Sequence, residues 1–194
     1  MPQRSVNLNI IQRPLSYAQR LDSRRSEDIN LFVVHCTELP DLAMARVYGE
    51  KVHYPEAQTG NSGHFYIDRD GSVEQWVPLD RVAHHVKGFN PASIGVELVN
   101  TGRYPDWFCS VNQTMSEPYP VLQIRALVAL INHLQARLTG LVNIAGHEDL
   151  DTGMIVSEDR SDTMIRRKLD PGPLFPWSEF MVNVSLHRIY AEDI

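Results

Sequence analysis

The stretch INLFVVHC, residues Ile29–Cys36, is a nearly continuous apolar run with β-branched residues that ends in a polar group. Runs of this kind are typical of strands buried on both faces of a sheet. Two later stretches have a similar character, SIGVELV at Ser93–Val99 and LVNIA at Leu141–Ala145. Segments with helical spacing separate these strands. Strands that interleave with helices predict a single α/β domain with a central mixed β-sheet flanked by helices.

A hairpin and three helices are expected around these strands. Alternating residues over His64–Asp68 and Ser72–Val77 flank an Asp-Gly pair, which predicts an antiparallel hairpin. Apolar residues at helical spacing predict the clearest helix over Val121–Leu138. The other expected helices are residues 41–52, with Asp41 as N-cap, and Trp177–Tyr190.

Three segments show no clear period. Residues 1–28 are polar and irregular, and we expect an N-terminal arm there, ahead of one domain over residues 29–194. Gly102–Pro120 and Glu148–Arg167 are expected to be long loops, and such loops in a compact domain are usually functional or disordered. The first loop carries four aromatic residues, Tyr104, Trp107, Phe108 and Tyr119. They indicate either packing over the core or one wall of a substrate groove.

Composition and charge exclude several classes of protein. The chain has 194 residues, 43% hydrophobic and 22% charged, which is typical of a soluble globular protein. Its net charge of −6 and its lack of a long basic stripe argue against a nucleic-acid partner. No apolar run approaches the roughly 20 residues that span a bilayer, so no membrane association is expected. Two cysteines, Cys36 and Cys109, are too few for a disulfide scaffold and are expected to be reduced thiols.

Two histidines follow buried strands at the positions where ligands collect in α/β sheets. His35 ends the first strand and His147 follows the strand at Leu141–Ala145. Asp170, in a Pro-Gly-Pro turn, can supply a third ligand, and two imidazoles with one carboxylate make an open zinc site of the catalytic type. Glu97 lies among apolar neighbours, where it is either an outward-facing residue or a general base beside a metal.

Six motifs occur in a characteristic order along the chain. They are Val33–His35, Gly63–Gly71, His84–Asn90, Ser93–Leu98, Gly146–Asp149 and Lys168–Gly172. With them the chain resembles the zinc-dependent N-acetylmuramoyl-L-alanine amidases of the amidase-2 type, a family that includes phage amidases and peptidoglycan recognition proteins. Within this family the resemblance is closest to the AmpD-like anhydromuramyl-peptide amidases.

The resemblance implies one zinc ion per chain and a peptidoglycan or muropeptide substrate. The family hydrolyses the amide between the lactyl group of N-acetylmuramic acid and L-alanine, in peptidoglycan or in its anhydromuramyl-peptide fragments. The residues that the resemblance assigns are the zinc ligands His35, His147 and Asp170, the water-activating Glu97, the oxyanion-stabilising Lys168, and the substrate-groove residues His85 and Asn90.

The chain departs from the family pattern at three places. Gly63 stands where some members have a catalytic tyrosine, which favours the version that uses a glutamate and a lysine. Cys36 follows His35 directly, and strand alternation is expected to turn it to the opposite face, into the core.

His147 and Asp170 are 23 residues apart, and Asp151–Arg167 looks inserted between them. Loop closure costs grow slowly with length, so the ends can stay in place. The acidic residues of this insertion, Glu158, Asp159 and Asp162, are expected to be solvated.

Two other functions, and more than one cellular location, are compatible with parts of the sequence. A non-catalytic peptidoglycan-binding module of the same fold is the main alternative, and the presence of all five predicted zinc and catalytic residues favours the enzyme. A zinc-free hydrolase with a Cys36–His35 dyad is disfavoured because adjacent strand residues face opposite ways.

The start, Met1–Asn9, has no apolar signal segment, which predicts a cytoplasmic protein. A mature exported form and a phage lysin released by lysis are the alternatives.

Overall fold

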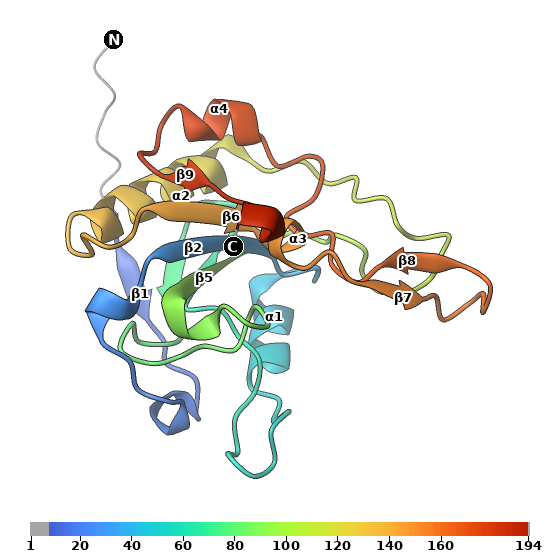
Figure 1. The fold of residues 1–194 in the computed structure, drawn as a ribbon, viewed down its shortest axis with the longest axis horizontal. Coiled ribbons are helices and arrows are strands. Elements are labelled where there is room, and N and C mark those ends of the chain that lie inside the picture. Colours follow the sequence, from blue (N-terminus) through green and yellow to red (C-terminus); the bar gives the residue numbers. More distant parts are fainter. Residues whose placement is uncertain (1–7, 194) are drawn as a thin grey trace.

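The computed structural model describes residues 8–193, which form a seven-stranded mixed sheet, helices on both of its faces, and a two-stranded hairpin that projects to one side (Figure 1). The strand order in the large sheet is β1-β4-β3-β5-β2-β6-β9. In that order the strands are Ile10–Gln12, Val73–Gln75, Phe65–Ile67, Ser93–Leu98, Leu31–Cys36, Asn143–Gly146 and His187–Arg188.

Strand β2 lies in the interior of the sheet. It pairs in parallel with β5 on one side and with β6 on the other, as buried apolar runs predict. Strand β3 pairs in parallel with β5 and antiparallel with β4, so the expected hairpin and the mixed sheet are both confirmed. Because β2, β5 and β6 run the same way, their carboxyl ends meet at one edge.

The helices cover the two faces of the sheet. Helix α2 (Val121–Gln135) and α4 (Trp177–Met181) lie on one face, and α1 (Leu42–Gly49) lies on the other (Figure 1). Asp41 caps α1 as expected, since its Oδ1 accepts a hydrogen bond from the Met44 N–H at 2.7 Å. The shorter helices are α3 (His147–Leu150) and four 3₁₀ turns at Ala18–Arg20, Ser26–Asp28, Asn90–Ala92 and Ala191–Asp193.

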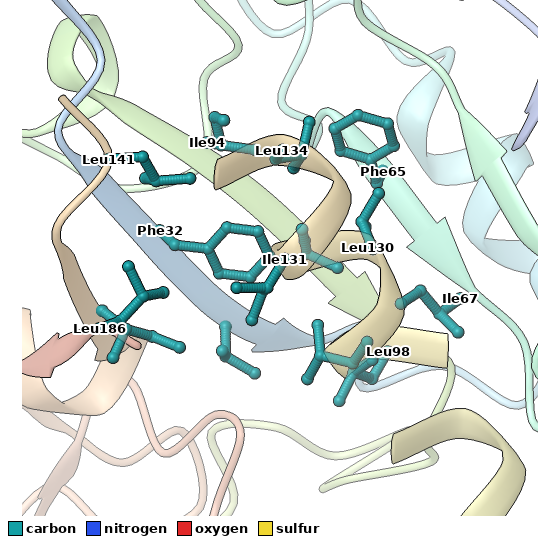
Figure 2. Close-up of a cluster of buried hydrophobic side chains, with 14 of the residues drawn as sticks. Phe32, Phe65, Ile67, Ile94, Leu98, Leu130, Ile131, Leu134, Leu141 and Leu186 are labelled. Carbon is teal, nitrogen blue, oxygen red and sulfur yellow. The ribbon is translucent and has the colours of Figure 1, made fainter. Parts of the chain in front are cut away.

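The main core lies between the sheet and α2. Phe32 and Ile94 point from β2 and β5 onto Leu130, Ile131 and Leu134 of the helix (Figure 2). The opposite face of β2 presents Leu31 and Val33, which pack against Val86, Ala145 and Leu150. His35 continues this second face at the strand end. Cys36 faces the other way and is buried, as predicted.

The N-terminal segment differs from the expected irregular arm. Residues 1–7 lie outside the described part of the chain, but Ile10–Gln12 adds a parallel edge strand beside β4. Tyr17 is fully buried, and its hydroxyl donates a hydrogen bond to the Gly49 carbonyl at 2.7 Å. The apolar residues of this segment are too widely spaced to form a periodic pattern, yet they cover the face of the sheet that α1 covers.

Three other expectations were wrong in detail. The helix predicted to run to Leu138 ends at Gln135. The segment after His147 is not a plain loop, because it contains α3 and the hairpin β7 (Met154–Val156) and β8 (Met164–Arg166). The closing helix stops at Met181, and the chain then adds β9 beside β6. Asn183 supports the end of α4, since its Nδ2 donates a hydrogen bond to the Glu179 carbonyl at 2.7 Å, one of the carbonyls that a helix end leaves without a partner.

No helix within residues 8–193 is both long and apolar enough to cross a membrane.

Candidate metal centre and groove

Three buried side chains with metal-ligating atoms meet at the carboxyl edge of the sheet. His35 Nδ1 lies 2.9 Å from Asp170 Oδ2, and His147 Nδ1 lies 3.1 Å from the same oxygen. One ligand atom from each of the three residues lies within 4.8 Å of the other two. Each residue is at most 3% exposed. The structure therefore brings together the three residues whose spacing suggested an open metal site.

The chemistry of this cluster fits a zinc ion. Asp170 Oδ1 is buried and has no hydrogen-bond partner among residues 8–193, so the carboxylate has a free ligating oxygen. Two imidazoles and a carboxylate are zinc's usual donors, and tetrahedral bonds of about 2.0–2.1 Å place ligand atoms roughly 3.3 Å apart. Burial, and then the neighbouring His147, lower the pKa of His35 from 6.5 to about 4. His35 is consequently neutral at pH 7, which is the form that binds a metal.

The turn that carries Asp170 approaches the sheet closely because Gly146 has no side chain. A Cβ on Gly146 would lie 2.8 Å from Pro171 Cδ. The Glu148 N–H donates a hydrogen bond to the Asp170 carbonyl at 2.9 Å, which fixes the turn to the first turn of α3. Parallel pairing of β2 with β6 places Val34 opposite Gly146, so His35 and His147 follow side by side.

Glu97 lies in one row with His35 and Tyr66 across three strands. The register pairs Glu97 of β5 with His35 of β2 on one side and with Tyr66 of β3 on the other. Burial, and then the negative charge of Asp170, raise the pKa of Glu97 well above its ordinary value, against the opposing effect of Lys168. Glu97 is therefore a stronger base than an exposed glutamate.

Gly63 and Glu97 occupy one space between them. A Cβ on Gly63 would lie 2.9 Å from Glu97 Cγ, so a larger residue at 63 would displace the glutamate. The Gly63 N–H instead donates to the Tyr66 hydroxyl at 3.2 Å. This explains physically why the chain combines a glycine at 63 with a glutamate at 97. The sequence analysis did not identify Tyr66 as a site residue, although its place beside Glu97 follows from the strand register.

Lys168 and Asp170 stay in the site despite the long insertion because Arg103 holds the base of the hairpin. The Arg103 guanidinium is buried and donates to both carboxylate oxygens of Glu38, at 2.7 and 2.9 Å. It also donates to the carbonyls of Arg166 and Arg167, at 3.2 and 3.3 Å. The two residues that precede Lys168 are thus fixed to the segment that follows β2.

His85 and Asn90 border the groove but hydrogen-bond mainly within the protein. His85 Nδ1 lies 3.0 Å from His35 Nε2, and His85 Nε2 lies 3.1 Å from Ser93 Oγ. Asn90 Oδ1 accepts hydrogen bonds from the backbone N–H groups of His85 and Val86, at 3.0 and 2.8 Å. Asn90 therefore shapes the loop that presents His85. This structural role was not part of the prediction that Asn90 belongs to the substrate groove.

The metal cluster forms the floor of an open groove of about 900 Å³. Glu97, Tyr66 and Lys168 line the same groove. Five aromatic or histidine side chains also line it, namely Tyr48, Tyr54, His84, Trp107 and Phe108. The Tyr48 and Trp107 rings contact each other, with centroids 6.1 Å apart. A groove with charged groups at its floor and aromatic side walls can hold an extended polar ligand against a reactive centre.

The two segments predicted as long loops contact each other beside the groove, and we call them together the wall. Of their residues, Arg103, Trp107, Phe108 and Arg167 line the groove. The Glu158 N–H donates to the Phe108 carbonyl at 2.8 Å. The backbone N–H and the hydroxyl of Ser110 donate to the two carboxylate oxygens of Asp159, at 2.6 and 2.7 Å. These bonds lower the pKa of Asp159 below its ordinary value. Glu158 and Asp162 are exposed, as expected, whereas the exposed Asp159 has a structural partner.

The sequence left two roles open for the four aromatic residues of the first loop, packing over the core or lining a substrate groove, and the structure divides the residues between these roles. Trp107 and Phe108 line the groove. Tyr104 contacts the Trp107 ring, and the two ring centroids are 5.7 Å apart. Tyr119 packs on Phe175, and its hydroxyl donates to the Pro171 carbonyl at 2.7 Å, which supports the turn beside Asp170.

Comparisons with known proteins agree with this geometry. The N-acetylmuramoyl-L-alanine amidase family model matches residues 25–173. The 1,6-anhydro-N-acetylmuramyl-L-alanine amidase AmpD of Enterobacter cloacae is 33% identical over 123 residues, 59% of this chain and 52% of that protein. The chain therefore spans about half the length of that relative. An endolysin of Klebsiella phage KP32 is 30% identical over 129 residues, 65% of this chain and 79% of that protein.

A solved structure extends the likeness to the fold. A crystal structure of AmpD, determined as a selenomethionine derivative, has a TM-score of 0.61 and 26% sequence identity to this chain. The superposition covers 95% of this chain and 99% of that chain. The single-domain mixed sheet flanked by helices, predicted from the strand pattern, is thus the fold of this family.

Proposed function

The chain belongs to the N-acetylmuramoyl-L-alanine amidase family, and from this membership we propose that it is a zinc-dependent amidase. The bond it hydrolyses is the amide between the lactyl group of N-acetylmuramic acid and L-alanine. The observation that carries the proposal is the buried cluster of His35, His147 and Asp170 in the floor of the groove. The same groove holds a carboxylate and an ammonium group, which are the further groups that amide hydrolysis needs.

The ligands would be His35 Nδ1, His147 Nδ1 and the Asp170 carboxylate. Zinc bound there supplies a Lewis acid and lowers the pKa of a coordinated water to about 7. Glu97 accepts a proton from the attacking water and returns it to the leaving amine of L-alanine. Its raised pKa suits both steps, because a carboxylate with a higher pKa is the better base and still releases the proton. A bound cation would lower this pKa again.

Lys168 supplies positive charge near the reacting carbonyl. Its side chain lines the groove with Glu97 and Asp170. An ammonium group fixed before the reaction stabilises negative charge as it develops on the carbonyl oxygen. The hydrogen bonds from Arg103 to the two preceding carbonyls support this placement.

We propose anhydromuramyl peptides, or the peptidoglycan that contains the same bond, as the substrate class. The name of AmpD specifies the 1,6-anhydro form, and the endolysin relative suggests polymeric wall as a substrate. Trp107, Phe108, His84 and Tyr54 line the groove and would contact the sugar or the stem peptide. The cytoplasmic location stays a prediction and fits the smaller substrate.

Incubation with both substrates tests the proposal. The zinc-loaded protein is mixed with an anhydromuramyl tripeptide or with purified peptidoglycan, and the products are identified by mass spectrometry. We expect a free peptide that begins with L-alanine and a sugar that ends in a free lactyl carboxylate. Binding of either substrate without turnover would overturn the proposal in favour of a peptidoglycan-binding module.

A further inference from the structure

A chain of three side chains runs from the candidate metal centre to the start of β5. His35 uses Nδ1 toward Asp170, and its other ring nitrogen, Nε2, lies 3.0 Å from His85 Nδ1. His85 Nε2 lies 3.1 Å from Ser93 Oγ. The Ser93 hydroxyl donates to the Phe89 carbonyl at 2.8 Å. Each of the two imidazoles therefore uses both of its nitrogens in this chain.

The hydrogen bond at the far end sets the direction of the others. The single hydroxyl proton of Ser93 lies between Ser93 Oγ and the Phe89 carbonyl oxygen, because two oxygens 2.8 Å apart repel without one. Ser93 Oγ then accepts from His85 Nε2–H. A neutral imidazole has one donor and one acceptor, so His85 Nδ1 accepts from His35 Nε2–H. This direction leaves His35 Nδ1 without a proton, which is the state a metal ligand requires, and its approach to within 2.9 Å of Asp170 Oδ2 then requires a cation between the two atoms.

We propose that His85, held by Ser93, is a positioning residue that fixes the tautomer and the ring orientation of His35 for zinc binding. This inference rests on the proposed function, since it assumes that His35 is a zinc ligand. It gives His85 a role other than substrate contact. Metal-ligating histidines usually donate their second N–H to such a partner, and the partner raises the affinity of the ligand.

The surrounding residues are arranged to hold the His85 ring in this place. A Cβ on Gly95 would lie 2.5 Å from His85 Cγ, so the ring occupies space that only glycine leaves at that position. Asn90 fixes the backbone of His85 through the hydrogen bond to its N–H. The Ser93-Ile94-Gly95 motif thus supplies both the acceptor for His85 and the room for its ring.

The second histidine ligand has a looser arrangement. His147 Nε2 lies 4.0 Å from Asp151 Oδ2, beyond hydrogen-bond distance. Asp151 also forms an ion pair with Arg167. We therefore expect His35 to depend more strongly on its supporting residue than His147 does.

Zinc affinity of purified variants tests the proposal without reference to catalysis. The dissociation constant for zinc is measured by competition with a chromophoric chelator, and correct folding is checked by circular dichroism. His85→Leu, which fills the space but cannot accept a hydrogen bond, should weaken zinc binding by about 10- to 100-fold. His85→Gln, whose side-chain oxygen can accept from His35, should recover most of that loss. A residue needed only for packing would not show this difference.

Two more variants complete the experiment. His84→Leu is the matched control, because His84 is the adjacent histidine and packs against Tyr54 with ring centroids 4.7 Å apart. It should keep the wild-type zinc affinity. Ser93→Ala leaves both histidines in place and should weaken zinc binding less than His85→Leu. It provides the test if the leucine variant does not fold.

The results separate this inference from the proposed function. Wild-type zinc affinity in folded His85→Leu and in Ser93→Ala would overturn the role of His85 and leave the amidase proposal intact. Equal loss in His85→Gln and His85→Leu would also overturn it. Failure of the wild-type protein to bind zinc would overturn both proposals. Tight zinc binding without amide hydrolysis would overturn only the proposed function.

Discussion

The floor of the groove and the wall beside it are built in opposite ways. The floor consists of buried side chains at the ends of paired parallel strands, and its three candidate ligands are at most 3% exposed. The wall is the projecting β7–β8 hairpin and the loop over residues 102–120, which contact each other through hydrogen bonds at their exposed tips (Figure 1). Met154, Val156 and Met164 of the hairpin are about half exposed.

This difference separates the parts that carry chemistry from the parts that shape the ligand site. Strand register fixes His35, Glu97 and Tyr66 in one row, and packed strands hold such positions to a fraction of an ångström. The wall depends on a few polar contacts and can vary in length while its base stays in place. Lys168 lies where the two regions join, and Arg103 is the residue that connects them.

Loss of the metal should have the largest effect. We expect a strong chelator to abolish amide hydrolysis and added zinc to restore it. His35→Ala, His147→Ala and Asp170→Ala should each lose both zinc and activity, because three protein ligands hold the ion. Zinc content by mass spectrometry and turnover of an anhydromuramyl tripeptide are the measurements. Full turnover in a verified metal-free sample would contradict the zinc-dependent mechanism.

Removal of the base should separate binding from chemistry. Glu97→Gln should keep zinc and fold but reduce kcat by about 10²- to 10⁴-fold, the usual contribution of a positioned acid–base group. Glu50→Gln, on the surface at the end of α1, is the control and should keep its turnover. Near-normal turnover in Glu97→Gln would show that another group takes the proton.

The junction between floor and wall should be the most sensitive point for stability. Arg103→Met leaves the carboxylate of Glu38 buried without its cation, which typically costs about 3–5 kcal/mol of unfolding free energy. Arg160→Met breaks an ion pair with Asp162 in which the two side chains are 60% and 77% exposed, and should cost less than about 1 kcal/mol. Urea unfolding of both variants measures the difference. Equal costs would contradict the structural role of Arg103.

Shortening the wall should change substrate preference and leave the floor unchanged. The Arg167 N–H donates to the Gly153 carbonyl at 2.9 Å, so a tight turn can replace residues 154–166 without moving Lys168 or Asp170. We expect the shortened protein to bind zinc normally. Its activity on polymeric peptidoglycan, relative to a soluble muropeptide, should rise several-fold because the hairpin no longer projects beside the groove (Figure 1). If that ratio stays constant while zinc is bound, the hairpin does not select the substrate.

The smallest effect concerns the far end of the loop over residues 102–120. Burial alone would raise the pKa of Glu117, but hydrogen bonds from Arg69 and Thr101 lower it from 4.5 to about 2. A pKa below the unfolded value stabilises the fold above about pH 4.5, and that stabilisation disappears as the pH falls through 2. Glu117→Gln should therefore lower the unfolding free energy at pH 7 but not near pH 2. A constant difference across this range would show that the ionised carboxylate is not the cause.

The sequence predicted the floor far better than the wall, for physical reasons. Apolar runs such as Ile29–Cys36 are unambiguous when both faces of a strand are buried, and their ends locate His35 and His147. The hairpin has only three residues per strand, with polar residues between them, so its pattern resembled a loop. The edge strands β1 and β9 were missed because strands of two or three residues show no period and depend on partners distant in sequence.

Side-chain hydrogen bonds were the other part beyond sequence analysis. The spacing of His85 and Ser93 gives no sign that one supports the other, and the partner of His35 emerged only from the folded geometry. Arg103 and Glu38 are 65 residues apart, and no pattern in the sequence pairs them. The place of Tyr66 beside Glu97 depends on the register of β3 with β5, which the sequence does not show.

X-ray diffraction at the zinc absorption edge, on crystals of the zinc-loaded protein, tests the central claim most directly. We predict one anomalous peak per chain, bonded to His35 Nδ1, His147 Nδ1 and the Asp170 carboxylate at zinc-ligand distances of about 2.0–2.2 Å. A zinc peak at other residues, with this cluster still held together by its own hydrogen bonds, would contradict the assignment of the floor as the metal centre.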